Sequence, residues 1–381
     1  MNPVRVQSSA LKYPFMHKMI SLLCRAMCAF IGWMLPALTL QAQQAPAWSV
    51  FPALPDPEGM AGMFAGESGG RLFCMGGANF PDKKPWEGGT KVWYDVIFRL
   101  REDGTWERMS QALPARMAYG VSAAYGDELI LVGGSNERVF LADVWAMRWT
   151  QGQLTFRKLP SLPFPLANMA GCRAGKLLIV AGGNESLTGP PLSKCLALDL
   201  ENIEKGWIEL PGWPGPARTQ PVAGTHAGDF FLFSGEGIAR DSAGINLRTL
   251  YRDVYRLRTR KVEGSWTGQW ERLSDLPGSV SASANPVPVD RKGRFYCWGG
   301  VSENISRHRD PATHPGIERK LIIYPASGSG IRQLATPPDL RSRVTLPSVH
   351  WKGQWIFISG EVRPGVRTPS NVVMKPGSGR R

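Results

Sequence analysis

Six short apolar runs recur along the chain, and each one ends in a pair of residues that contains glycine. Each run predicts a short β-strand, and a variable loop follows each pair. Most copies continue with two more strand-like segments and a Pro-rich joint, so the chain repeats one structural unit. The pairs are Gly76-Gly77, Gly133-Gly134, Gly182-Gly183, Ser234-Gly235, Gly299-Gly300 and Ser359-Gly360.

The spacing of these pairs indicates how much structure each copy holds. Successive pairs lie 49 to 65 residues apart, which is enough for four short antiparallel strands and their loops. This pattern resembles the kelch repeat, in which each copy forms one blade of a β-propeller. We therefore predict an all-β fold, a six-bladed kelch-type β-propeller. Glycine suits the pair because the backbone there turns sharply and packs against a neighbouring blade, where a Cβ would obstruct it.

The sixth copy is incomplete at its C-terminal end. Only a few residues follow the strand expected at 371–376, so the outermost strand of the last blade is missing there. Residues 47–57 carry the Trp-to-Leu-Pro pattern that ends the other copies. We predict that Trp48–Leu54 pairs with the strand around Asn371–Met374, because such closure protects sheet edges from association with other chains. A single propeller is expected over residues 46–381.

Residues 1–45 differ from the rest of the chain and are typical of a secretory signal peptide. They contain four basic residues and no acidic one, then an apolar stretch at 27–40 and small residues at Ala42 and Ala45. A basic start, a short apolar region and a small-residue cleavage site direct export. An uncleaved N-terminal anchor is the alternative, although the stretch is short for a bilayer and Pro36 interrupts it. We expect an exported body with no stable membrane insertion after leader removal.

Composition and charge argue against several classes of function. The chain has 43 Gly, 31 Pro and 14 Trp among 381 residues, which suits many short strands and tight turns. Without the four basic residues of the leader, the formal net charge falls from +14 to +10. The remaining basic residues are scattered and often lie beside acidic ones, with no run of lysines. We therefore predict no nucleic-acid partner.

The cysteines and histidines give no sign of a metal site. The sequence contains no Cys-x-x-Cys and no His-Glu-x-x-His spacing. Four cysteines lie within or beside apolar strand segments and show no paired spacing. We expect these four to be buried free thiols rather than disulfides, and they are Cys74, Cys172, Cys195 and Cys297.

The residues that follow the glycine pairs are candidates for a ligand site. In a four-stranded blade these loops emerge on the same face as the Pro-rich joints, so both ring one mouth of the central channel, and ligands favour such concave mouths. Two alternatives to ligand binding remain. The asparagines can equally hold a turn through their side chains, and the arginines can form ion pairs within the blades. After the pairs come Asn79, Asn136, Asn184, Glu236, Asn304 and Glu361, and the joints supply Arg116, Tyr119 and Arg218.

The sixth copy stands apart because its loop is charged. Residues 356–368 read IFISGEVRPGVRT, with Pro364-Gly365 between Glu361 and Arg367. A Pro-Gly turn reverses the chain, so both charged side chains can point into the same mouth. The turn itself requires neither charge. This pair is therefore the leading candidate for chemistry.

Three stretches carry a resemblance to a known family. GGANFP (76–81), LPARMAYGVS (113–122) and SGEVRPGVRT (359–368) resemble the bacterial N-acetylneuraminate epimerases, or sialic acid mutarotases, which are exported six-bladed kelch propellers. The resemblance covers essentially all of the mature chain. In the better-known form the Gly-Glu loop precedes the GGANFP blade, whereas here it comes last. The chain therefore looks like the circularly permuted branch. Residues 302–319 depart from the family's pattern, which bears on the preferred sugar.

The resemblance implies a function and roles for particular residues. The family's proposed catalytic Glu and Arg, six residues apart, fall on Glu361 and Arg367. The implied isomerase interconverts the α and β anomers of N-acetylneuraminate in the periplasm and needs no cofactor or metal. A carboxylate can move the protons, and a guanidinium can bind the carboxylate of a small anionic sugar.

Asn79, Arg116 and Glu236 are expected to contact the substrate. The alternative function is a non-catalytic kelch propeller that binds a carbohydrate or a partner protein through the same face.

Overall fold

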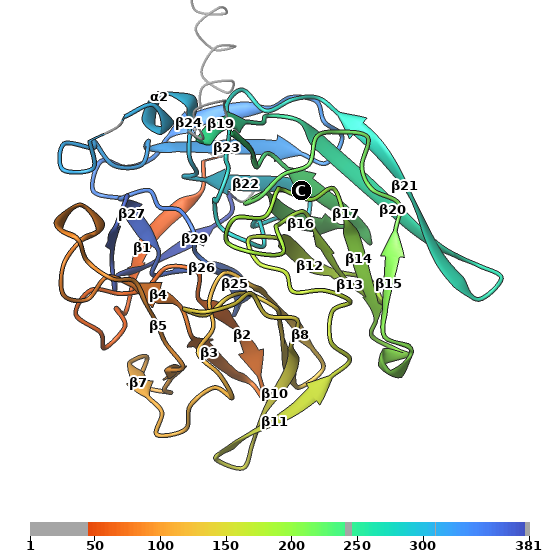
Figure 1. Ribbon diagram of the computed structural model, residues 1–381, viewed down its shortest axis with the longest axis horizontal. Helices are drawn as coiled ribbons and strands as arrows, with labels where there is room; N and C mark the ends of the chain where they lie inside the picture. The colour runs from red at the N-terminus through yellow and green to blue at the C-terminus, as the bar shows by residue number, and fades with distance from the viewer. Residues whose placement is uncertain (1–44, 241–245, 309, 378–381) are drawn as a thin grey trace, which may run out of the picture. The chain divides into compact units, whose positions relative to one another are not determined.

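Residues 48–375 fold as a ring of six small antiparallel β-sheets, each of which is one blade of a propeller (Figure 1). The computed structural model describes residues 45–240, 246–308 and 310–377. The predicted signal peptide lies outside these residues except for its last position. The predicted all-β, six-bladed propeller is confirmed.

Each of blades one to four is a sheet of four strands that follow one another along the chain. In blades one and four a small hairpin is inserted between the second and the third strand. Blade one contains β2 (Phe64–Ser68), β3 (Arg71–Met75), β6 (Ile97–Leu100) and β7 (Trp106–Arg108), and blade two contains β8 (Val121–Tyr125), β9 (Glu128–Val132), β10 (Val144–Thr150) and β11 (Gln153–Leu159). Blade three contains β12 (Ala170–Ala174), β13 (Leu177–Ala181), β14 (Cys195–Asp199) and β15 (Trp207–Leu210). Blade four contains β16 (Val222–His226), β17 (Asp229–Phe233), β20 (Val254–Val262) and β21 (Ser265–Leu273).

The last two blades and the inserted segments complete the unit. Blade five contains β22 (Arg294–Trp298), β23 (Lys320–Pro325) and β24 (Arg332–Ala335), and blade six contains β25 (Ser348–Trp351), β26 (Gln354–Ile358), β29 (Asn371–Lys375) and β1 (Ala47–Phe51). The hairpins are β4 (Ala78–Asn79) with β5 (Val92–Trp93), β18 (Glu236–Arg240) with β19 (Asn246–Leu250), and β27 (Glu361–Arg363) with β28 (Val366–Arg367). The described helical turns are η1 (Pro85–Glu87), η2 (Ile203–Lys205) and α2 (Glu303–Ser306). No helix of the described residues is long and apolar enough to cross a membrane.

Blade five has three strands, so the expectation of four strands in every copy is wrong there. The segment that would be its innermost strand is 285–289, which meets β22 through one bridge between Val289 and Phe295. Pro286 and Pro288 interrupt this segment. Proline has no backbone N–H, so a regular hydrogen-bonded ladder cannot form along it.

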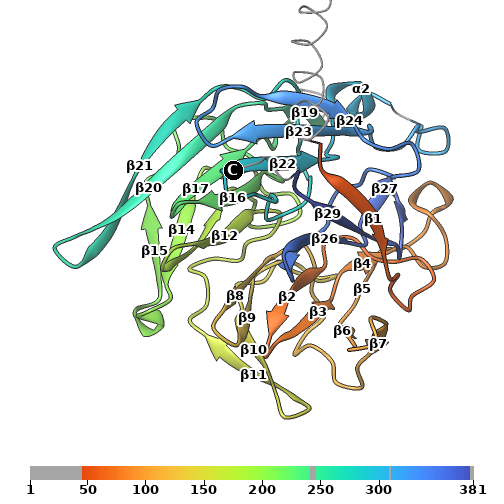
Figure 2. The same ribbon diagram turned by 180° about the vertical axis from the view of Figure 1, so that it is seen from behind.

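The two ends of the propeller meet in blade six, as predicted. β1 lies beside β29 at the outside of that sheet (Figure 2). The side-chain amide of Asn371 donates to the carbonyl oxygen of Pro52 at 2.6 Å, and the amide of Leu54 donates to the carbonyl of Pro369 at 2.9 Å. The indole of Trp48 packs 5.2 Å from the ring of Trp298 in blade five. The N-terminal strand therefore closes the ring.

A second closure lies around the central channel and was not anticipated from the sequence. One residue per blade, just before the innermost strand, donates its amide to the carbonyl oxygen of its counterpart in the preceding blade, at N–O distances of 2.6–2.9 Å. The six bonds form a complete circle. All six residues have left-handed backbones with φ between 49° and 66°, and they are Gly62, Tyr119, Asn168, Gln220, Ala282 and Thr345.

The glycine pairs and the cysteines behave as expected. A Cβ placed on Gly76 would lie 2.4 Å from the carbonyl oxygen of Met117, in the joint to the next blade, so close packing between blades requires glycine there. The four cysteines expected to be free are all buried and unpaired. Burial raises the pKa of their thiols, which keeps them protonated and inert.

The packing of β1 yields a first prediction. Replacing Trp48 by Ala removes the indole that contacts Trp298 and Phe357, and it should lower the free energy of unfolding by about 2 kcal/mol because the ring is only partly buried. Val50→Ala, on the same strand with a side chain 87% exposed, should leave that free energy almost unchanged. Urea unfolding of both variants measures this. Equal shifts in the two would contradict the closure by β1.

Candidate functional site

The charged loop of blade six is a β-hairpin that presents an ion pair. Glu361 on β27 lies directly opposite Arg367 on β28, so the two side chains project from the same face. Nη2 of Arg367 lies 2.8 Å from Oε2 of Glu361. Gly365, at the turn, has a φ of 76°, a conformation that L residues rarely adopt. The predicted reversal at Pro364-Gly365 is therefore present.

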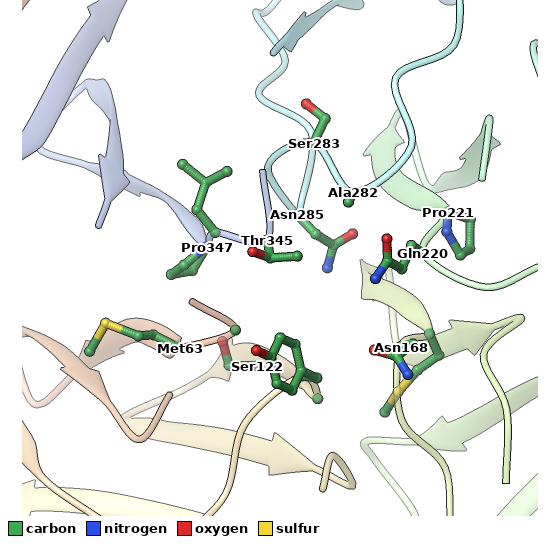
Figure 3. Close-up of a pocket in the computed structure, with 15 residues that line it drawn as sticks. Met63, Ser122, Asn168, Gln220, Pro221, Ala282, Ser283, Asn285, Thr345 and Pro347 are labelled. Atoms are coloured by element: carbon green, nitrogen blue, oxygen red, sulfur yellow. The ribbon is translucent and has the colours of Figure 1, made fainter. Parts of the chain in front are cut away.

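This pair lies on the wall of a cavity of about 530 Å³ at one mouth of the channel. Residues of the circle described above form part of the wall, and loops of blades one to three form the rest. A second space, of about 70 Å³, shares four lining residues with this cavity (Figure 3). In that view Asn168, Gln220, Asn285 and Thr345 surround the central opening. The shared residues are Tyr119, Asn168, Gln220 and Thr345.

Burial and nearby cations act on Glu361 in opposite directions. Loss of solvent raises the pKa of its carboxyl group, and the positive charges of Arg367 and Lys91 partly offset that rise. The net effect is a pKa above the ordinary value. A carboxyl group whose pKa is moved toward neutrality can both accept and donate a proton, as general acid–base chemistry requires.

Three residues that line the cavity each have a buried polar atom without a hydrogen-bond partner among the described residues. The atoms are Nε1 of Trp93, Oγ1 of Thr345, and Nε and Nη1 of Arg367, whose side chain is 3% exposed. These atoms have almost no exposed surface, so they are enclosed by protein behind the cavity wall. Lys91 adds a positive charge, with its Nζ 5.1 Å from the ring centre of Tyr119 and 5.3 Å from that of Trp93.

The structure separates the three secondary candidates from this cavity. Asn79 is buried, and its Nδ2 donates to Oε2 of Glu58 at 3.0 Å. The side chain of Arg116 is 56% exposed, with Nη1 3.9 Å from Oε1 of Glu137. Neither Asn79 nor Arg116 is among the described residues that line the cavity. Their contact with substrate stays a prediction.

Glu236 occupies the position in blade four that Glu361 occupies in blade six. Each directly follows its glycine-containing pair, and each exchanges two backbone hydrogen bonds with the residue before the circle. Glu236 is 2% exposed, and its Oε2 lies 3.1 Å from Nε of Arg248. Burial raises its pKa, and Arg248 partly offsets this effect. Glu236 does not line the cavity, although the charge of Arg248 also acts on Glu361.

The remaining candidates divide into structural and wall positions. Arg218 is fully buried and binds both oxygens of Asp253 at 2.7 and 2.8 Å, so the ion-pair alternative is confirmed. Asn136 lines the cavity, and its side-chain oxygen also accepts hydrogen bonds from the amides of Arg138 and Val139, which is the turn-forming role. Tyr119 belongs to the circle and lines the cavity.

The other two asparagines also bind their surroundings. Nδ2 of Asn184 donates to the carbonyl oxygen of Ser186 at 2.6 Å, and its Oδ1 accepts from Asn168 at 2.9 Å. Asn304 is exposed, and its Nδ2 donates to Oε1 of Glu318 at 3.1 Å. Both amides are therefore used within the protein.

Sequence reasoning missed Lys91, Gln220 and Thr345. The last two could have been found by aligning the joints, because Gly62 and Asn168 occupy the same place in their copies and are the residues that best tolerate a left-handed backbone. Lys91 lies in a variable loop without any repeated signal. No cluster of three or more His, Cys, Asp or Glu that could hold a metal occurs in the part of the chain that the structure describes.

The fold and the site together define a six-bladed β-propeller with a carboxylate–guanidinium pair in the mouth of its channel. A family model described as N-acetylneuraminate epimerase matches residues 36–156. The N-acetylneuraminate epimerase of Brucella melitensis biotype 1 is 24% identical over 256 residues, which cover 60% of this chain and 62% of that protein. The protein of the same name from Salmonella enteritidis PT4 is 41% identical over 90 residues, which cover 21% of this chain and 23% of that protein.

A solved structure described as that of YjhT aligns with a TM-score of 0.60 at 16% identity, covering 84% of this chain and 96% of that one. This likeness supports the fold. The chain spans 62% of the length of the Brucella melitensis relative and 65% of that of the N-acetylneuraminate epimerase of Brucella suis, to which it is 23% identical over 271 residues. The resemblance to the N-acetylneuraminate epimerases is confirmed.

The electrostatics of the pair lead to a second prediction. In Arg367→Met the strongest attraction on the Glu361 carboxylate is lost while its burial remains, so the pKa of Glu361 should rise above the wild-type value. A ¹³C NMR titration of labelled glutamate side chains measures this. Arg116→Met, at an exposed position, serves as the control and should not move the Glu361 resonance. An unchanged pKa in Arg367→Met would show that the ion pair does not form.

Proposed function

We propose that this protein is a sialic acid mutarotase, an isomerase that interconverts the α and β anomers of N-acetylneuraminate. The observation that carries the proposal is the ion pair of Glu361 and Arg367, both of which line a polar cavity. A guanidinium at a cavity wall suits an anionic ligand. The names of the relatives support the same substrate.

The reaction requires positioning of the sugar and movement of protons. The cyclic sugar carries a carboxylate and a hydroxyl group on its anomeric carbon, and Arg367 can donate N–H bonds to that carboxylate. Glu361, 2.8 Å from the guanidinium, then lies near the anomeric centre. In the proposed mechanism, its carboxylate takes the anomeric hydroxyl proton as the bond from the anomeric carbon to the ring oxygen breaks, and the carboxylic acid so formed gives that proton to the ring oxygen.

The open-chain ketone then rotates and recloses. Ring closure on the opposite face of the carbonyl gives the other anomer, with the same proton transfers in reverse. Both directions need a group that exists in protonated and ionised forms near working pH, and the raised pKa of Glu361 brings it closer to that condition.

Anomer exchange in Glu361→Gln tests the proposal directly. The amide cannot take a proton, so the catalysed rate should fall by about 100-fold or more. NMR of freshly released α-N-acetylneuraminate with and without protein measures the rate. Glu102→Gln makes the same change at an exposed carboxylate that does not line the cavity, and it should keep the wild-type rate. Exchange at the spontaneous rate with wild-type protein, or full activity in Glu361→Gln, would refute the proposed catalysis.

The alternative, a non-catalytic propeller that binds a carbohydrate or a partner protein, makes a different prediction in the same experiment. It expects binding of the sugar that depends on Arg367 while exchange stays at the spontaneous rate. Glu361 favours the catalytic function, because a site that only binds an anionic sugar gains little from a second negative charge beside the sugar's carboxylate.

We also propose that residues 1–45 direct export to the periplasm. The basis is the sequence of the leader alone, with its basic start, apolar stretch and small residues at Ala42 and Ala45. Cell fractionation followed by N-terminal sequencing should find the protein in the periplasm, beginning near residue 46. Retention of the leader at the membrane would support the anchor instead, and a cytoplasmic protein would contradict export.

A further inference from the structure

We propose that Lys91 is a second cation for the carboxylate of the sugar, acting beside Arg367, and that aromatic rings hold it in place for this contact. This inference rests on the proposed function and extends it to a residue outside the charged hairpin. Lys91 directly precedes β5 and lines the cavity that contains Glu361 and Arg367. The residue is half-buried, and its Nζ is not one of the atoms enclosed behind the cavity wall, so a ligand can reach it.

The ammonium group of Lys91 lies over three aromatic rings. Its Nζ is 5.1 Å from the ring centre of Tyr119, 5.3 Å from that of Trp93 and 5.6 Å from that of Phe80. The face of an aromatic ring attracts a cation but has no net charge, so these contacts hold the ammonium group without neutralising it. Among the described residues, Lys91 forms no ion pair with an acidic side chain.

Two other lysines show what a purely structural contact of this kind looks like. Lys158 and Lys261 each lie over a tryptophan ring. Each also pairs with a carboxylate, Lys158 with Asp143 at 2.7 Å and Lys261 with Asp199 at 3.2 Å, and neither lysine lines the cavity. Their charges are therefore compensated within the protein, whereas the charge of Lys91 is available to a ligand.

The charges around Glu361 leave one cation without a partner. Three positive charges act on its carboxyl group, those of Arg367, Lys91 and Arg248. Arg367 is paired with Glu361 itself, and Arg248 is paired with Glu236 at 3.1 Å. Lys91 remains, so a ligand with one negative charge completes the pairing. A partly buried ammonium group gains most from such a partner, because it has already lost part of its hydration.

Lys91 and Arg367 approach the mouth from different blades but meet at one ring. Cζ of Arg367 lies 5.0 Å from the ring centre of Phe80, the ring that also lies beneath Lys91. A carboxylate has two oxygen atoms, and both can accept charge-assisted hydrogen bonds. The other charged residues of the wall are exposed, so water and salt screen their charges, and they are Glu137, Arg138 and Glu185.

The test removes the ammonium group and keeps most of the side chain. Lys91→Met should raise KM for anomer exchange of N-acetylneuraminate about 10-fold, because one charge-assisted contact is lost. Lys91→Arg keeps the positive charge and the contact with the rings, and it should stay within about threefold of wild type. Lys352→Met makes the same change at an exposed lysine that lies over Trp351 and does not line the cavity, and it should keep the wild-type KM.

Thermal unfolding of each variant checks that the propeller is intact. A wild-type KM in Lys91→Met would overturn the inference, and so would an equal rise in Lys352→Met.

An uncharged substrate shows whether the contact is with the carboxylate. The methyl ester of N-acetylneuraminate keeps the anomeric hydroxyl group but has no negative charge. Wild type and Lys91→Met should therefore have the same KM for the ester, within about twofold. A loss with the ester as large as the loss with the acid would contradict a contact between Lys91 and the carboxylate.

Calorimetric binding of N-acetylneuraminate separates this inference from the proposed function. If the wild-type protein binds the sugar without catalysing exchange, the catalytic proposal fails, and weaker binding by Lys91→Met still supports the contact. If exchange is catalysed but wild type and Lys91→Met bind the sugar equally well, the catalytic proposal stands and the contact with Lys91 is refuted.

Discussion

Six backbone hydrogen bonds around the channel are the constraint on which the rest of the structure depends. Each bond joins one blade to the next, and each residue in the circle adopts a left-handed backbone that is unfavourable for most side chains. Such a conformation persists because closure of the whole ring determines it. In five of the blades these residues lie two or three positions before the innermost strand, so the circle fixes where those strands begin relative to one another.

Two buried arginines show how similar residues acquire different roles. Arg218 has hydrogen bonds to Asp253 and to the carbonyl of Ser234, so its charge is satisfied within blade four. Arg367 pairs with Glu361, and its guanidinium lies 5.0 Å from the ring centre of Phe80. Arg218 stabilises the fold, because breaking a buried pair is costly. Arg367 differs in that it and its partner line the cavity.

The site therefore combines features that a purely structural region would avoid. Unpartnered donors, a carboxyl group with a raised pKa and a strained threonine lie around one cavity. The apolar packing between blades offsets their cost, since the strands of the central layers are almost completely buried. Glu236 with Arg248 repeats the arrangement in blade four, at the equivalent position of its own hairpin, but away from the cavity wall.

The sequence by itself determined the repeat, the closure of blade six by Trp48–Leu54 and the pairing of Glu361 with Arg367. These features rest on local rules, namely apolar strand patterns, glycine at sharp turns and the reversal at Pro-Gly, which act over a few residues. Only the tertiary structure decided which polar atoms lack partners. Asn79 is occupied by Glu58, and Arg116 faces solvent, because their neighbours come from distant segments. The circle, and with it the place of Thr345 in the wall of the cavity, exists only once all six blades have met.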